Sequence, residues 1–173
     1  MLDKASFRKT VFAFLLPMAI QNLINVAVSS TDVIMLGRYS EVTLSASSLA
    51  SQIQFILILL FFGIGSGATV LTAQYWGKKD TKSIEKILAI GIKIAFGLSL
   101  IFFIFAFFFS RNAMRLFTND EATILEGIKY LKIVSFSYLT TSISIVYLVT
   151  MRSVEKVMIS TITYATSFVS NFI

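Results

Sequence analysis

Long stretches without charge dominate this chain. No charged side chain occurs between Thr43 and Ala73, or between Ile94 and Phe109. The hydrocarbon core of a bilayer is about 30 Å thick, and about 20 apolar residues in a helix span it. Because lipid offers no hydrogen-bond partner to free backbone groups, such runs are expected to be helices. The pattern therefore predicts an all-α integral membrane protein, built as a polytopic helix bundle.

Charged connectors divide the apolar pattern into segments. We expect five transmembrane helices, with the approximate limits 11–36, 44–75, 84–109, 130–151 and 157–173. The last segment is barely long enough to span and has no polar stop behind it, so we expect the chain to be cut off inside this helix. The segment 118–132 mixes charge with apolar residues at helical spacing, and we expect it to lie along the outer membrane interface.

Composition excludes several classes of function. Hydrophobic residues make up 56% of the chain and charged residues 14%, whereas soluble domains carry roughly 25% charged residues. The absence of Cys and His excludes thiolate catalysis, cysteine–zinc sites and a histidine base. We see no nucleophile–base pair that would support an enzyme. The net charge is +6, but the basic residues lie between the apolar runs, so we expect no nucleic-acid partner.

The distribution of basic residues predicts the orientation in the membrane. Nine lie in connectors on one side and five on the other. Because cytoplasmic connectors carry an excess of Lys and Arg, we expect a multi-pass protein of the cell (inner) membrane with a cytoplasmic N-terminus. The nine are Lys4, Arg8, Lys9, Lys78, Lys79, Lys82, Lys86, Arg152 and Lys156, and the five are Arg38, Arg111, Arg115, Lys129 and Lys132.

One face of the first predicted helix is polar. At 100° per residue, its polar side chains Gln21, Asn25, Ser29 and Asp32 lie within about 80° of one another. Asp32 is the acid within a predicted span, and a charge there costs roughly 2.5–3.5 kcal/mol. It is therefore expected to face a wet cavity or a partner, as a site for a proton or a sodium ion. The alternative is an acid near the outer helix end that bonds to its neighbours or reaches water.

The second predicted helix contains several glycines. Gly63 and Gly67 form a Gly-x-x-x-Gly pair, which allows another helix to approach closely. A phosphate-binding loop would need a preceding strand and a following lysine, and neither is present. We therefore expect Gly63 and Gly67 to be helix-packing residues.

Several short motifs, in order along the whole chain, resemble the multidrug and toxic compound extrusion (MATE) transporters. The first helix carries Leu16-Pro17 and then a Thr-Asp-Val-Ile-Met-Leu-Gly run, and the second carries a glycine-rich run and an Ala-Gln-Tyr-Trp-Gly exit. The later landmarks are Tyr130-Leu131, Met151-Arg152 and Ser170-Asn171. Each motif alone is weakly specific, but their order and the helix count together are more so.

The resemblance implies an antiporter with twelve helices in two six-helix lobes, which exports organic cations against sodium ions or protons. In this family pattern Asp32 matches the cation-coupling acid of the N-terminal lobe, and Asn171 matches an asparagine that lines the same cavity; both would be ligands if sodium is the coupling ion. Residues 1–173 would then be a truncated N-terminal lobe with about five of its six helices. No other cofactor is expected. Transport would require the missing C-terminal lobe, and the partners would be the lipid bilayer and small cationic substrates.

Two alternatives remain open. One is a lipid-linked saccharide flippase of the same superfamily, although the glycine run and Gln74-x-x-Gly77 favour the drug-exporter branch. The other is a non-transporting fragment with at most a partner-binding role. Reading the coding DNA beyond codon 173 would separate a fragment from a transporter.

Overall fold

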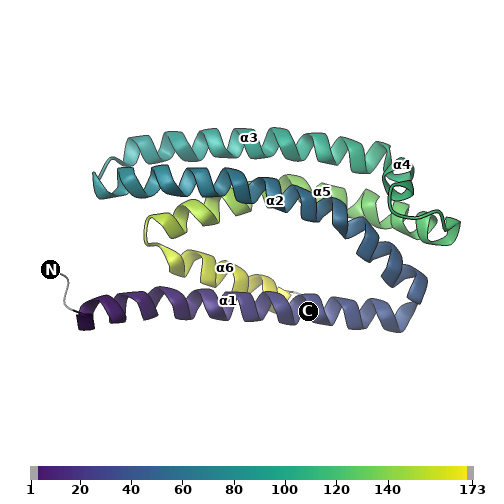
Figure 1. The fold of residues 1–173 in the computed structure, drawn as a ribbon, viewed down its shortest axis with the longest axis horizontal. Coiled ribbons are helices and arrows are strands. Elements are labelled where there is room, and N and C mark those ends of the chain that lie inside the picture. Colours follow the sequence, from purple (N-terminus) through teal and green to yellow (C-terminus); the bar gives the residue numbers. More distant parts are fainter. Residues whose placement is uncertain (1–3, 171–173) are drawn as a thin grey trace.

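The computed structural model describes residues 4–170, except for the side chains of residues 4–10, 13, 14, 32, 168 and 169. Within these residues the chain is helical and contains no strand. Its helices are α1 (Lys4–Tyr39), α2 (Glu41–Gly77), α3 (Thr81–Phe108), α4 (Ser110–Arg115), α5 (Glu121–Ser153) and α6 (Val157–Ser170). The predicted all-α polytopic bundle is therefore confirmed (Figure 1).

Four of these helices, α1, α2, α3 and α5, are long and apolar enough to cross a membrane. The fifth predicted span begins at Val157 as expected, and α6 comprises 14 described residues. Large apolar side chains cover the outer surface, including Phe62 and Ile133 with about three-quarters of each exposed. A surface of this kind suits hydrocarbon better than water.

Most of the segment 118–132, which was expected to precede the fourth span along the interface, is the first part of a longer helix. Asp120 caps a helix that begins at Glu121 and continues unbroken to Ser153. Its carboxylate accepts hydrogen bonds from the backbone N–H and the hydroxyl of Thr123, and these bonds lower the pKa of Asp120. The helix is continuous after this cap, so the charged first turns and the apolar span form one element.

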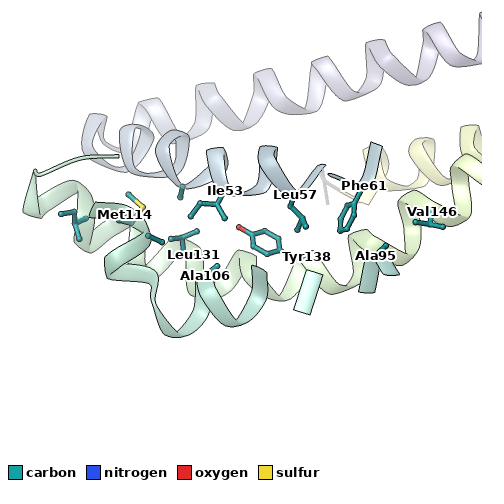
Figure 2. Close-up of a cluster of buried hydrophobic side chains, with 12 residues drawn as sticks. Ile53, Leu57, Phe61, Ala95, Ala106, Met114, Leu131, Tyr138 and Val146 are labelled. Atoms are coloured by element: carbon teal, nitrogen blue, oxygen red, sulfur yellow. The ribbon is translucent and has the colours of Figure 1, made fainter. Parts of the chain in front are cut away.

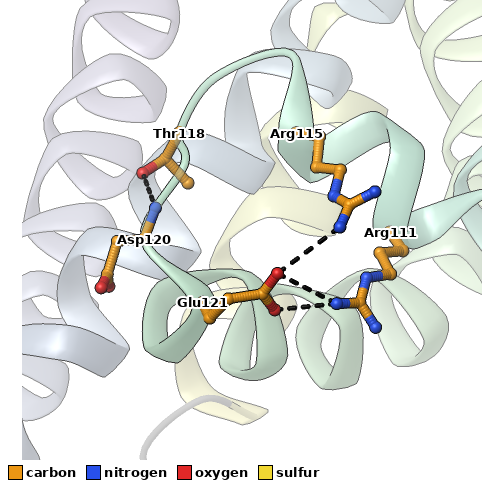
Figure 3. Close-up of polar contacts among 5 residues, drawn as sticks. All are labelled: Arg111, Arg115, Thr118, Asp120 and Glu121. Carbon is orange, nitrogen blue, oxygen red and sulfur yellow. Dashed lines mark hydrogen bonds and ion pairs between the residues drawn. The ribbon is translucent and has the colours of Figure 1, made fainter.

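A small outer corner joins α3 to α5. The six-residue α4 was not predicted, and its Arg111 donates two hydrogen bonds to Glu121 at 2.9 and 3.0 Å. Arg115 lies 3.5 Å from the same carboxylate (Figure 3). The Met114 side chain packs directly on Gly127, where a Cβ atom would leave no room for it. These contacts fix the start of α5 against the end of α3.

The helices form two groups (Figure 1). Helices α2, α3 and α5 pack on one another as a three-helix bundle, and α1 lies alongside α6. The core of the bundle contains large side chains of α2 and α5 facing alanines of α3 (Figure 2). Its central residue, Tyr138, is buried and its hydroxyl has no partner among the described atoms. We call these groups the bundle and the α1–α6 pair.

Candidate functional site

The polar stripe predicted on α1 divides into two parts in the structure. Gln21 is buried, with 2% of its surface exposed. One and two turns further on, Asn25 and Ser29 are exposed and line an open, shallow groove. The rest of the groove lining is Val26, Ser30, Val33 and Ile34, all on α1. An amide and two hydroxyls are thus presented on the open side of a helix of membrane-spanning length.

The two residues proposed to bind the coupling cation are only partly described. Asp32 lies in α1, one turn beyond Ser29, but its side chain is outside the description. Asn171 lies outside the described residues altogether. Among the residues that are described, no three acidic side chains come together as a metal site. The sodium site at Asp32 and Asn171 therefore stays a prediction.

Gln21 belongs to a polar cluster that connects three helices. Its amide nitrogen donates to the Thr161 hydroxyl on α6 at 2.7 Å. Its amide oxygen accepts a hydrogen bond of 2.5 Å from Nη2 of Arg152, in the last turn of α5. Because a guanidinium can only donate, this orientation of the amide is required.

Arg152 makes two further contacts, both with α6. Its Nε donates to the hydroxyl of Ser160, which is completely buried, at 3.2 Å. Its Cζ lies 5.7 Å from the centroid of the Tyr164 ring, within range of a cation–π interaction. We call Gln21, Arg152, Ser160, Thr161 and Tyr164 the Arg152 cluster.

The sequence analysis missed this cluster, because it assigned Arg152 to a cytoplasmic connector. The available signal was the position of Arg152 at the end of an apolar run, followed by Ser160 and Tyr164 at a spacing of four residues. Helical spacing places these two on one face of α6. What the pattern could not supply was the distance to Gln21, which is 131 residues away in the chain.

The structure also contains a polar groove on α2 that the sequence analysis did not single out. It is lined by Ser51, Gln52 and Gln54 together with Phe55 and Ile58. The available signal was the presence of two polar amides inside an uncharged and mostly apolar run. Amides are costly in hydrocarbon unless they are hydrogen-bonded, so this groove is a second surface that suits water or a polar partner.

Within the described residues no helix packs closely on Gly63 or Gly67, so the packing role expected of them stays a prediction. A Cβ atom at either position would meet no atom within 4 Å, and both glycines line a groove between α2 and α3. The close approach is made instead by Gly65, where a Cβ would lie 3.4 Å from Val149 of α5. Gly91 of α3 is closer still, at 3.1 Å from Val146. The close helix contacts in the described chain thus use glycines at positions that the sequence analysis did not single out.

Comparison with known proteins identifies a family and several relatives of this chain. A family model described as MatE matches residues 17–173. Probable multidrug resistance protein YoeA of Bacillus subtilis (strain 168) is 24% identical over 136 residues, which cover 78% of this chain and 29% of that protein. Uncharacterized transporter YisQ of the same organism is 23% identical over 125 residues, covering 72% and 28%.

A third relative is Probable multidrug resistance protein NorM of Bradyrhizobium diazoefficiens. It is 30% identical over 84 residues, which cover 49% of this chain and 18% of that protein. The chain therefore spans less than a third of the length of these curated relatives. No solved structure matches it significantly.

Proposed function

The chain belongs to the MatE family of membrane transporters, and from this premise we propose that it forms the N-terminal part of an antiporter that exports organic cations. The observation that carries the proposal is the open groove of Asn25 and Ser29 on α1, a helix of membrane-spanning length. Polar side chains exposed at membrane depth are expected to face a water-filled cavity or a partner. We propose that this groove is one wall of the substrate cavity.

In the proposed mechanism, Asp32 exchanges a coupling cation for the substrate. Its place in the sequence continues the face of Asn25 and Ser29 by one helical turn. A carboxylate can balance the charge of a proton, a sodium ion or an organic cation in turn. An exporter needs such a site to have different affinities in its two conformations, because a ligand shifts an equilibrium only by its differential affinity. Asn171 is the proposed second ligand on the same cavity.

We further propose that a second lobe completes the cavity. The chain spans 29% of YoeA, and two-lobed transporters bind their substrates where the two halves meet. The open side of α1, which carries the groove, is the proposed face toward that lobe. In the proposed orientation the N-terminus is cytoplasmic and the membrane is the inner membrane, from the excess of basic residues on one side.

The test is efflux of a fluorescent cation such as ethidium from cells that express the complete encoded protein. Asp32→Asn keeps the shape of the side chain but removes its charge, and it should abolish efflux at matched expression. Glu85→Gln is the matched control, since it removes one charge from an exposed position at the start of α3 and should leave efflux unchanged. Undiminished efflux by Asp32→Asn would refute the proposed role of Asp32.

A further inference from the structure

The α1–α6 pair and the bundle are joined by few polar contacts. The chain itself connects them at Ser40, between α1 and α2, and again between α5 and α6. Among the side chains that the structure describes, the hydrogen bonds from one group to the other are those of Arg152 with Gln21 and Ser160. Arg152 is thus the polar joint between the two groups.

The geometry of this joint depends on the planar guanidinium. Nε and Nη2 lie on the same edge of the group, and this edge bonds α6 through Ser160 and α1 through Gln21 at once. The Cζ atom of the group lies over the Tyr164 ring, 5.7 Å from its centroid. Two donors on one rigid edge, bonded to α6 and to α1 at the same time, restrict the distance between these helices at Arg152. Lysine has no such edge, because its ammonium is a single point of charge on a flexible stem.

The partners of Arg152 are all neutral: an amide, a hydroxyl and an aromatic ring. No carboxylate among the described side chains lies within 4 Å of it. Separating a buried pair of opposite charges leaves an uncompensated charge on each side and is strongly unfavourable. Separation from neutral partners leaves only one charge to be hydrated, so this contact is suited to being formed and broken repeatedly.

We propose that Arg152 is a positioning residue for transport. In one conformation its hydrogen bonds hold the α1–α6 pair against the bundle, and in the other conformation these bonds are broken. The inference rests on the proposed function, because α1 carries the groove and Asp32. A shift of the pair against the bundle would then carry the proposed cavity wall between its two openings, while the apolar bundle stays fixed. Gln21 and Ser160 are the two points at which Arg152 holds the pair.

The role of Arg152 in holding the pair against the bundle is tested first, by a measurement that does not depend on transport. The chain contains no cysteine, so spin labels can be attached at Met158→Cys on α6 and Phe108→Cys on α3, both of which are exposed. Pulsed electron paramagnetic resonance then reports the distance between the pair and the bundle. We expect one narrow distance distribution in the parent and a broader or shifted one in Arg152→Lys. Lys156→Gln, an exposed charge four residues away, is the control and should leave the distribution unchanged.

Whether the contact between Arg152 and Gln21 must break during transport is tested by strengthening it. Gln21→Glu places a carboxylate against Arg152, and the Thr161 hydroxyl can donate to it in place of accepting from the amide. We expect a higher thermal midpoint together with ethidium efflux lowered roughly fivefold or more, the lower end of couplings between two states. A merely structural contact would give a higher midpoint with unchanged efflux, and this result would overturn the proposal.

The two proposals fail in different ways. Unchanged label distances and efflux in Arg152→Lys would overturn the positioning role. If Arg152→Lys does not reach the membrane, the Gln21→Glu variant decides by itself. Absence of efflux in the parent would refute the proposed transport function, and the label distances would still decide whether Arg152 holds the pair against the bundle.

Discussion

The bundle and the α1–α6 pair are held together by different forces. In the bundle, Phe61 and Leu57 of α2 are buried against α5 and the alanines of α3, and glycines allow close backbone approach. Within the pair, the Gln21 amide donates a hydrogen bond to the Thr161 hydroxyl, and Arg152 of α5 bonds both helices of the pair. The first group has a core of large apolar side chains with a few buried hydroxyls, whereas hydrogen bonds link the second group internally and to the bundle.

This difference matters because lipid is as apolar as a protein core. Helices in a bilayer therefore associate through packing and hydrogen bonds, without a hydrophobic driving force between them. Close packing permits only one arrangement, since small displacements lose many contacts at once. Hydrogen bonds to neutral partners can be exchanged for others at smaller cost. The bundle is accordingly suited to be a rigid frame and the pair to be the part that moves.

The largest expected effect comes from removing a packed side chain from the bundle. Phe61 is fully buried and its neighbour Phe62 is 75% exposed, so the two form a matched pair. Phe61→Ala should lower the free energy of unfolding by about 2 kcal/mol or more, below the 3–5 of soluble cores because transfer to lipid is nearly neutral. Phe62→Ala should have little effect. Thermal midpoints in detergent would measure both, and equal values would show that the bundle is not close-packed.

An intermediate effect is expected where a larger side chain overpacks the core of the bundle. Gly65→Leu pushes against Val149 and should destabilise by about 1–3 kcal/mol, as overpacking does. Gly63→Leu, two residues away, meets open space and should be tolerated. The yield and thermal midpoint of the purified variants would test this. Loss of folding in Gly63→Leu with a normal Gly65→Leu would support the packing role predicted for Gly63.

Much of the fold follows from the sequence because its signal is local. Uncharged runs of sufficient length predicted α1, α2, α3 and α5, since the bilayer requires both length and apolarity. The continuous start of α5 was not predicted, because an amphipathic first turn has the same pattern whether it lies in the interface or extends a span. Its continuity depends on the cap at Asp120 and the packing of Met114 on Gly127, which are properties of the folded chain.

The candidate site was only partly predictable. The polar face of α1 was recognised, since helical periodicity places Gln21, Asn25 and Ser29 together. Their separation into a buried amide and an exposed groove depends on where α6 packs, and one-dimensional periodicity contains no information on this. Arg152 was missed for the same reason: beside a helix end, a half-buried arginine that bonds other helices and a solvent-exposed one have the same sequence signature.

The smallest expected effect concerns the pair. Thr161 accepts a hydrogen bond from the buried amide of Gln21, whereas Thr163 is exposed and bonds only to the carbonyl of Ile159 in its own helix. Thr161→Ala removes a hydrogen bond between helices, worth about 0.6 kcal/mol on average in membrane proteins. Thr163→Ala should lower the stability even less, because removing an exposed hydroxyl that bonds only within its own helix breaks no contact between helices. Thermal midpoints of the two variants, measured beside Phe61→Ala in the same detergent, would rank the contacts. A loss at Thr161 as large as that at Phe61 would mean that the pair is held as firmly as the bundle, and the division into a rigid frame and a moving part would have to be abandoned.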